Sequence, residues 1–156
     1  MQKMDIEALF RKLRLSIPFD GHKILPYLLK SMKIDRANQV WAADITYIPM
    51  KKGFMYLTAI IDLYSSYIVG WGISNTLDAE ASLSVMKQAI KEHGKPEIIN
   101  SDQGSQFTCE NWIELMTTEG ILISMDGKIN FARTVCFYKL AAILTSLYFR
   151  IIYLLF

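Results

Sequence analysis

The sequence predicts an α/β domain with a mixed β-sheet and crossover helices on its faces, in the order β-β-β-α-β-α-β. Three runs rich in β-branched and aromatic residues follow one another with short connections, a pattern typical of an antiparallel meander. Two later segments repeat apolar residues at helical spacing, and each leads into a short apolar run typical of a buried strand. A strand reached through a helix is expected to lie parallel to its partner.

The three strands of the meander are predicted from the turn residues that separate them. The first run covers 40–48 and stops at Pro49, which has no amide hydrogen to donate within a sheet. A turn at 51–53 leads into the second run at 54–63, and the third run covers 67–73. Connections this short cannot hold a crossover, so the three strands must run antiparallel.

The two helices are predicted from their periodicity and their end signals. The first begins after N-cap candidates at 76–78 and is ended by Gly94 and Pro96. The second covers 109–119 and is capped by Gly120. The short strands that follow these helices are expected at 97–101 and 121–125.

Charge divides the 156-residue chain into a basic N-terminal segment at 1–37, a core at 38–126 and an apolar tail at 127–156. The first carries eight Lys and Arg against four Asp and Glu, the core five against eleven, and the tail four against none. Within the tail, 18 of the 23 residues from 134 to 156 are apolar. The core is therefore expected to be the folded domain, and the tail needs a separate explanation.

Composition excludes two classes of protein. A formal net charge of +2 with 52% hydrophobic residues excludes a disordered chain, which needs high charge and low hydrophobicity. Two cysteines cannot build a disulfide framework, so we expect free thiols and a cytoplasmic protein. The first seven residues mix charges and contain no apolar run, so no secretory signal is expected.

Two carboxylates lie where a sheet of this kind binds ligands. Asp44 is inside the first strand, and Asp102 directly follows the fourth. If these two strands are neighbours, the carboxylates converge at the carboxyl end of the sheet. A hard divalent cation such as Mg²⁺ would neutralise both charges through oxygen ligands.

Each carboxylate also has a structural interpretation. Asp44 could pair with a lysine or lie at a sheet edge, and Asp102 could form an Asx turn before Gly104. Asp62 also falls on a predicted strand, and we interpret it as structural because it precedes a turn.

Three motifs together carry a family resemblance: Trp41-Ala-Ala-Asp-Ile-Thr-Tyr-Ile48, Gly94-Lys-Pro-Glu97 and Ser101-Asp-Gln-Gly-Ser-Gln-Phe107. With them, residues 17 to 128 resemble the integrase catalytic core of bacterial insertion-sequence DDE transposases, in particular the second-frame product of the type made from two overlapping reading frames. The resemblance implies an RNase H-like fold, a site of three carboxylates and two Mg²⁺ or Mn²⁺ ions, and DNA strand cleavage and transfer. It implies that Asp44 and Asp102 are catalytic and metal-binding.

The resemblance also implies DNA as the partner rather than a small-molecule substrate, and leaves open whether the chain assembles as a homo-oligomer on DNA. Four polar residues near the motifs are candidate phosphate contacts, with solvated loop positions as the alternative: Lys51, Lys52, Gln103 and Gln106.

The third carboxylate of the family is absent. The resemblance places a glutamate on the helix after the last strand, but the family's spacing from Asp102 leads to Tyr138, and no Asp or Glu follows Asp126. The C-terminal catalytic helix is thus expected to be missing or replaced. We expect negligible strand transfer, and we hypothesise a decayed remnant of a transposase gene, created by truncation, a frameshift or a fusion junction.

Two other functions stay open at this point. The chain could be a non-catalytic nucleic-acid-binding module that uses its basic N-terminal segment. It could also be a membrane-tethered fragment, although the apolar run at 140–149 lies between Lys139 and Arg150 and is shorter than the roughly 20 residues that span a bilayer. We expect the tail to pack on the sheet face that the missing helix would leave uncovered.

Overall fold

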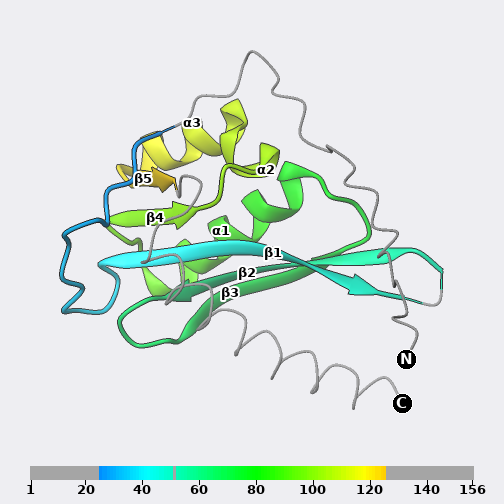
Figure 1. Cartoon of the computed structure of the whole chain (residues 1–156), viewed down its shortest axis with the longest axis horizontal. Coiled ribbons are helices and arrows are strands. Elements are labelled where there is room, and N and C mark those ends of the chain that lie inside the picture. Colours follow the sequence, from blue (N-terminus) through cyan, green and yellow to red (C-terminus); the bar gives the residue numbers. More distant parts are fainter. Residues whose placement is uncertain (1–24, 51, 126–156) are drawn as a thin grey trace, which may run out of the picture.

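A five-stranded mixed sheet with helices on one face forms the described part of the computed structural model, residues 25–50 and 52–125 (Figure 1). The strands are β1 Val40–Pro49, β2 Phe54–Asp62, β3 Ile68–Ser74, β4 Ile98–Ser101 and β5 Leu122–Met125. The helices are α1 Ala79–His93, α2 Ser105–Thr108 and α3 Glu110–Glu119. Most of the basic N-terminal segment and all of the apolar tail lie outside the described residues, as does the expected packing of the tail on the sheet.

The strand order is β3-β2-β1-β4-β5, and it confirms the predicted topology. Strands β1, β2 and β3 form the antiparallel meander, whereas β4 pairs in parallel with both β1 and β5. The first and fourth strands are therefore neighbours, which was the condition for bringing Asp44 and Asp102 together. One element was not predicted: α2 is a single turn of four residues, too short to show a helical period.

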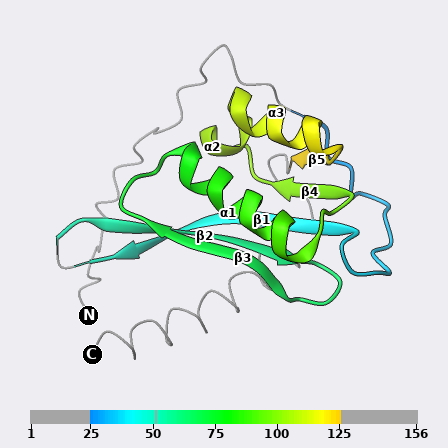
Figure 2. The ribbon, with the colours of Figure 1, turned by 180° about the vertical axis from the view of Figure 1, so that it is seen from behind.

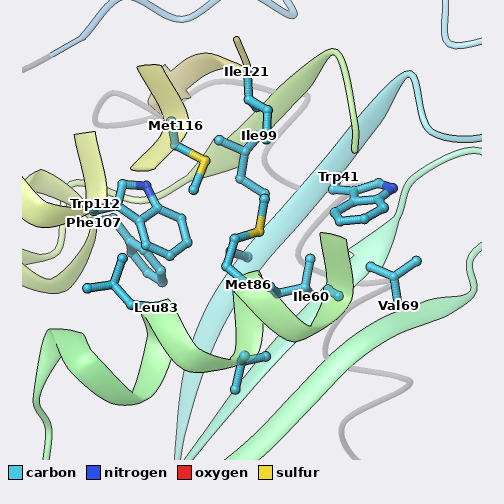
Figure 3. Close-up of a cluster of buried hydrophobic side chains, with 13 residues drawn as sticks. Trp41, Ile60, Val69, Leu83, Met86, Ile99, Phe107, Trp112, Met116 and Ile121 are labelled. Atoms are coloured by element: carbon cyan, nitrogen blue, oxygen red, sulfur yellow. The ribbon is translucent and has the colours of Figure 1, made fainter. Parts of the chain in front are cut away.

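The main apolar core lies between the sheet and the helices (Figure 2). Alternate residues of β1 and β2, such as Trp41 and Ile60, point to this side and meet Met86 of α1 and Trp112 of α3 (Figure 3). Helix α1 approaches β3 so closely that a Cβ added at Gly72 would lie 2.6 Å from a methyl carbon of Val85. The sheet and the helices are thus locked together by side chains from 41 to 121.

The opposite face of the sheet carries a smaller apolar cluster, made of Ala42, Ile48, Leu57, Ala59 and Ile61. Asp44 lies two residues after Ala42 along β1 and pairs with Ala59 of β2. Its side chain therefore points to the same face as theirs. The core helices and the predicted site therefore lie on opposite faces of β1.

Asp62 is the last residue of β2, and its burial and hydrogen bonds confirm that it has a structural role. Its side chain is 2% exposed. Its Oδ1 accepts from the amide of Asn38 at 3.1 Å, while Oδ2 accepts from the amide and hydroxyl of Ser65 at 2.9 and 2.5 Å. These bonds tie the turn after β2 to the residues that precede β1.

Within residues 25–50 and 52–125, no helix is both long and apolar enough to cross a bilayer, so the structure gives the membrane alternative no support. The apolar run at 140–149, on which that alternative depended, lies outside the described residues.

Candidate active site

The parallel pairing of β1 with β4 brings the two predicted carboxylates to the same level of the sheet. Ala42 pairs with Asn100, and Asp44 and Asp102 each follow two residues later. Residues two apart in a strand share a face, and neighbouring strands lie about 4.8 Å apart. The register therefore places Asp44 at the level of Asp102, which is the first residue after the carboxyl end of β4.

Asp44 is half-buried in the middle of the sheet. Strand β1 has β2 on one side and β4 on the other, so the sheet-edge alternative for this residue is wrong. Its neighbours on the same face are Ala42 along the strand and Ala59 across it. Such small side chains leave the space beside the carboxylate to other groups.

Asp102 is exposed at the start of the loop after β4. Its Oδ1 accepts from the amide of Gly104 at 2.9 Å, so the predicted Asx turn is present. A Cβ at Gly104 would lie 2.9 Å from that same oxygen, which explains why a glycine occupies the second position after Asp102. The turn fixes the carboxylate through Oδ1, and this does not conflict with a metal ligand at Oδ2.

Asn100 is a member of this site that the sequence analysis missed. It is 4% exposed, and its Oδ1 has no hydrogen-bond partner among the described residues. Its pairing with Ala42 puts it on the face of Asp44, one level below the carboxylates. The sequence feature that could have pointed to Asn100 is its amide side chain, which follows two isoleucines in a buried strand. A polar group without a partner is costly in such a strand.

The donor atoms at this place suit a hard cation, but they are few. Two carboxylates and an unpartnered amide oxygen are the oxygen ligands and acceptors that Mg²⁺ and Mn²⁺ prefer. Within residues 25–50 and 52–125, no three Asp, Glu, His or Cys side chains form a group that could hold a metal ion. The described residues thus supply two carboxylates to the site where the resemblance implied three.

The motif between α1 and β4 serves the fold. Gly94, with φ of 80°, ends α1, and the ammonium of Lys95 donates to the carbonyl of Glu119 at the end of α3 at 2.7 Å. Glu97 holds the guanidinium of Arg36 through contacts of 2.7 and 3.0 Å. The hydrogen bond and charge of Glu97 raise the pKa of Arg36 above its ordinary value.

The four candidate phosphate contacts lie in different settings. Gln103 is exposed next to Asp102, and Lys52 is exposed at the tip of the β1–β2 hairpin. The side-chain amide of Gln106 donates to the carbonyl of Leu77 at 3.3 Å, which ties α2 to the loop before α1. Lys51 lies outside the described residues. Of the three candidates that the structure describes, Gln103 alone is both exposed and adjacent to a carboxylate.

The β1–β2 hairpin projects past the helices in both views (Figures 1 and 2) and carries aromatic side chains that the sequence analysis did not single out. Tyr47 and Phe54 are 55% and 58% exposed. The ring of Tyr47 lies edge-on to those of Phe54 and Tyr56, with centroids 6.5 and 5.1 Å apart. The hairpin thus presents an aromatic surface next to Lys52.

Comparison with known proteins gives the same assignment from sequence. Residues 34–130 match the family model of the integrase core domain. The chain is 39% identical over 100 residues to the transposase of insertion sequence IS904 from Lactococcus lactis, covering 63% of the chain and 40% of the relative. It is 33% identical over 91 residues to the IS629 transposase of Shigella sonnei, covering 58% and 31%. The chain thus spans well under half the length of these relatives.

Solved structures agree on the fold. The catalytic core domain of HTLV-2 integrase in complex with magnesium, in its dimeric form, superposes with a TM-score of 0.53 at 28% identity, covering 57% of this chain and 61% of that one. A simian T-cell lymphotropic virus intasome bound to PP2A regulatory subunit B56 gamma superposes at 0.65 with 20% identity, covering 85% and 46%, and shows the fold alone. The RNase H-like fold is confirmed. With its motifs, sheet order and family match in agreement, the chain belongs to the integrase core domain family, and its relatives include transposases of bacterial insertion sequences.

Proposed function

We propose that the chain is the core of an insertion-sequence DNA transposase that keeps DNA and cation binding but has lost strand transfer. The observation that carries the proposal is the pairing of Ala42 with Asn100, which sets Asp44 level with Asp102 at the carboxyl end of β4. The proposed loss of activity is supported by Tyr138, which stands where the resemblance places the glutamate.

Asp44 and Asp102 would hold Mg²⁺ or Mn²⁺ in this site. In a two-metal site the ions stabilise the attacking and leaving oxygens of an in-line displacement at phosphorus. Asp44 is positioned by its place in the central strand, and Asp102 by its turn bond to Gly104. Both carboxylates are thus oriented before any ligand arrives, which lowers the cost of binding.

Two carboxylates carry half the charge of two divalent cations, so the second ion is held weakly. Loss of a hydrogen-bonding partner of a metal ligand already costs about 10–100-fold in affinity or activity. Loss of a ligand itself is expected to cost at least as much. We therefore assign to this chain cation binding at one position and negligible strand transfer.

DNA would lie across the exposed loop of Gln103 and the β1–β2 hairpin. The five steps along the strand from Asp44 to Pro49 span about 17 Å, which is about five nucleotides at 3.4 Å each. Lys52 at the hairpin tip would meet a phosphate, and Tyr47 and Phe54 would contact sugar or base. We expect the chain to bind DNA in the bacterial cytoplasm. We also expect it to assemble as a homo-oligomer on that DNA.

A nicking assay on a duplex that carries the ends of the element tests the proposal. With Mn²⁺, we expect no cutting above background by the natural chain, and DNA binding that weakens with salt. Asp44→Asn should leave DNA binding unchanged, because this residue is assigned to the cation. Cutting that disappears in Asp44→Asn would show that two carboxylates suffice, and the inactive assignment would be wrong. If the chain showed no salt-dependent binding to DNA, the proposed nucleic-acid function would be wrong as well.

A further inference from the structure

The amide oxygen of Asn100 is a buried acceptor that the described structure leaves without a donor. The side chain is 4% exposed, so bulk water does not satisfy it. Asn100 pairs with Ala42 on one side and with Ser124 on the other, in the middle of three parallel strands. The hydroxyl of Ser124 accepts from the amide of Leu28 at 3.0 Å, and it makes no hydrogen bond to the Asn100 oxygen. A lone acceptor in this position destabilises the fold unless a ligand supplies the proton.

The position of Asn100 relative to the carboxylates identifies that ligand. Asn100 shares the face of Asp44 and precedes Asp102 by two residues, which is about 6.6 Å along a strand. A cation held by carboxylates has its oxygen ligands at about 2.1 Å and keeps several of its waters. A water on the cation and its hydrogen bond together reach about 5 Å from the ion. Direct ligation at about 2.1 Å cannot bridge this offset, whereas a cation-bound water and its hydrogen bond cover most of it, so an ion that lies below the level of the carboxylates brings its water within reach of Asn100.

We propose that Asn100 is a positioning residue of the cation site: its Oδ1 accepts a hydrogen bond from a water on the ion that Asp44 and Asp102 hold. This inference rests on the cation binding of the proposed function and adds the residue that orients the bound water. The amide contributes an acceptor without further negative charge. Acceptors of this kind fix the waters and ligands of a metal ion and change its affinity about 10–100-fold.

The neighbouring Ser101 provides a matched control. Its hydroxyl is also buried, at 2% exposed, and also lacks a partner among the described residues. Because side chains alternate along β4, Ser101 points to the helix side of the sheet, away from Asp44. Ser101→Ala and Asn100→Leu therefore each remove an unpartnered polar group from the same strand, but only the second removes one from the cation site.

The test is a Mn²⁺ titration of the full chain, followed by electron paramagnetic resonance of the free ion, with melting temperatures measured in EDTA. We expect Asn100→Leu and Ser101→Ala to melt no lower than the natural chain in EDTA, because each loses an unsatisfied group. Mn²⁺ should bind Asn100→Leu about 10-fold more weakly or worse, and Ser101→Ala as tightly as the natural chain. Equal Mn²⁺ affinity for Asn100→Leu and the natural chain would overturn the inference.

A second variant keeps the test decisive if leucine disrupts the strand. Asn100→Asp retains an acceptor and adds a charge below Asp44 and Asp102, so it should melt lower in EDTA and be stabilised by Mn²⁺ more than the natural chain. An unchanged Mn²⁺-induced shift in this variant contradicts the assignment of Asn100. Asp44→Asn separates the two levels of argument: if it does not reduce Mn²⁺ binding, the proposed cation site itself is wrong, and the role of Asn100 is wrong with it.

Discussion

Replacing Asp62 by asparagine tests whether the structure separates the stabilising aspartate from the site aspartates. Both oxygens of Asp62 accept hydrogen bonds, from the amide of Asn38 and from the amide and hydroxyl of Ser65. An asparagine keeps at most one of these oxygens. Its best orientation retains both bonds from Ser65 and turns an NH₂ group toward the amide of Asn38, which is itself a donor.

The cost follows from these contacts. One hydrogen bond to a charged acceptor is lost and a buried donor is left unpaired, which is worth about 1.5–3 kcal/mol. For a chain of this size each kcal/mol lowers the melting temperature by about 2–4 °C, so Asp62→Asn should melt roughly 3–12 °C lower. Mn²⁺ affinity, corrected for the folded fraction, should not change.

The matched control is Asp102→Asn, measured by the same circular dichroism melts and Mn²⁺ titrations. Asp102 is exposed, and an asparagine at this position still accepts from the amide of Gly104, so the melting temperature should stay within about 2 °C. Mn²⁺ binding should fall at least 10-fold. The reasoning would be refuted if Asp62→Asn weakened Mn²⁺ binding of the folded protein, or if Asp102→Asn were the more unstable of the two.

Two further predictions concern the helix packing and the hairpin. Gly72→Ala places a methyl carbon 2.6 Å from Val85 and should cost about 1–3 kcal/mol in urea unfolding, with part of the loss restored when Val85→Ala is added; additive effects of the two changes would contradict the close contact. Lys52→Ala should weaken duplex binding and lower the slope of log K against log salt by about 0.9. A Glu119→Ala variant, which changes a side chain far from the hairpin, should leave that slope unchanged, and an unaltered slope in Lys52→Ala would remove this residue from the interface.

The sheet could be predicted from the sequence because its signals are local. Turn residues bound the meander, and Gly94 and Gly120 end helices that show a clear period. Helix α2 could not be predicted because one turn has no period, and its place depends on the bond from Gln106 to Leu77, 29 residues away. Through this bond Gln106, a candidate phosphate contact from the sequence, has a structural partner in the protein.

The candidate site divides along similar lines. Asp44 and Asp102 could be found because a charge in or at the end of an apolar strand is visible in the sequence. Asn100 could not, because a neutral amide in a short strand becomes informative only when the register shows which face it occupies and which groups it lacks. Strand register is set by pairing between distant segments, and no single run of residues encodes it.

The larger apolar core and the proposed cation site lie on opposite faces of one sheet, and only the smaller apolar cluster shares the face of the site. The apolar core on the helix side is built from residues between Trp41 and Ile121, whereas Asp44 and Asn100 point to the other side. In the proposed function, a site that lacks its third acid therefore loses a ligand and no member of that core. We therefore expect variants of the proposed site to keep the fold of the family, so that they can be compared in folded protein. If Asp44→Asn or Asn100→Leu abolished cooperative unfolding, the two faces would be coupled and this separation would be wrong.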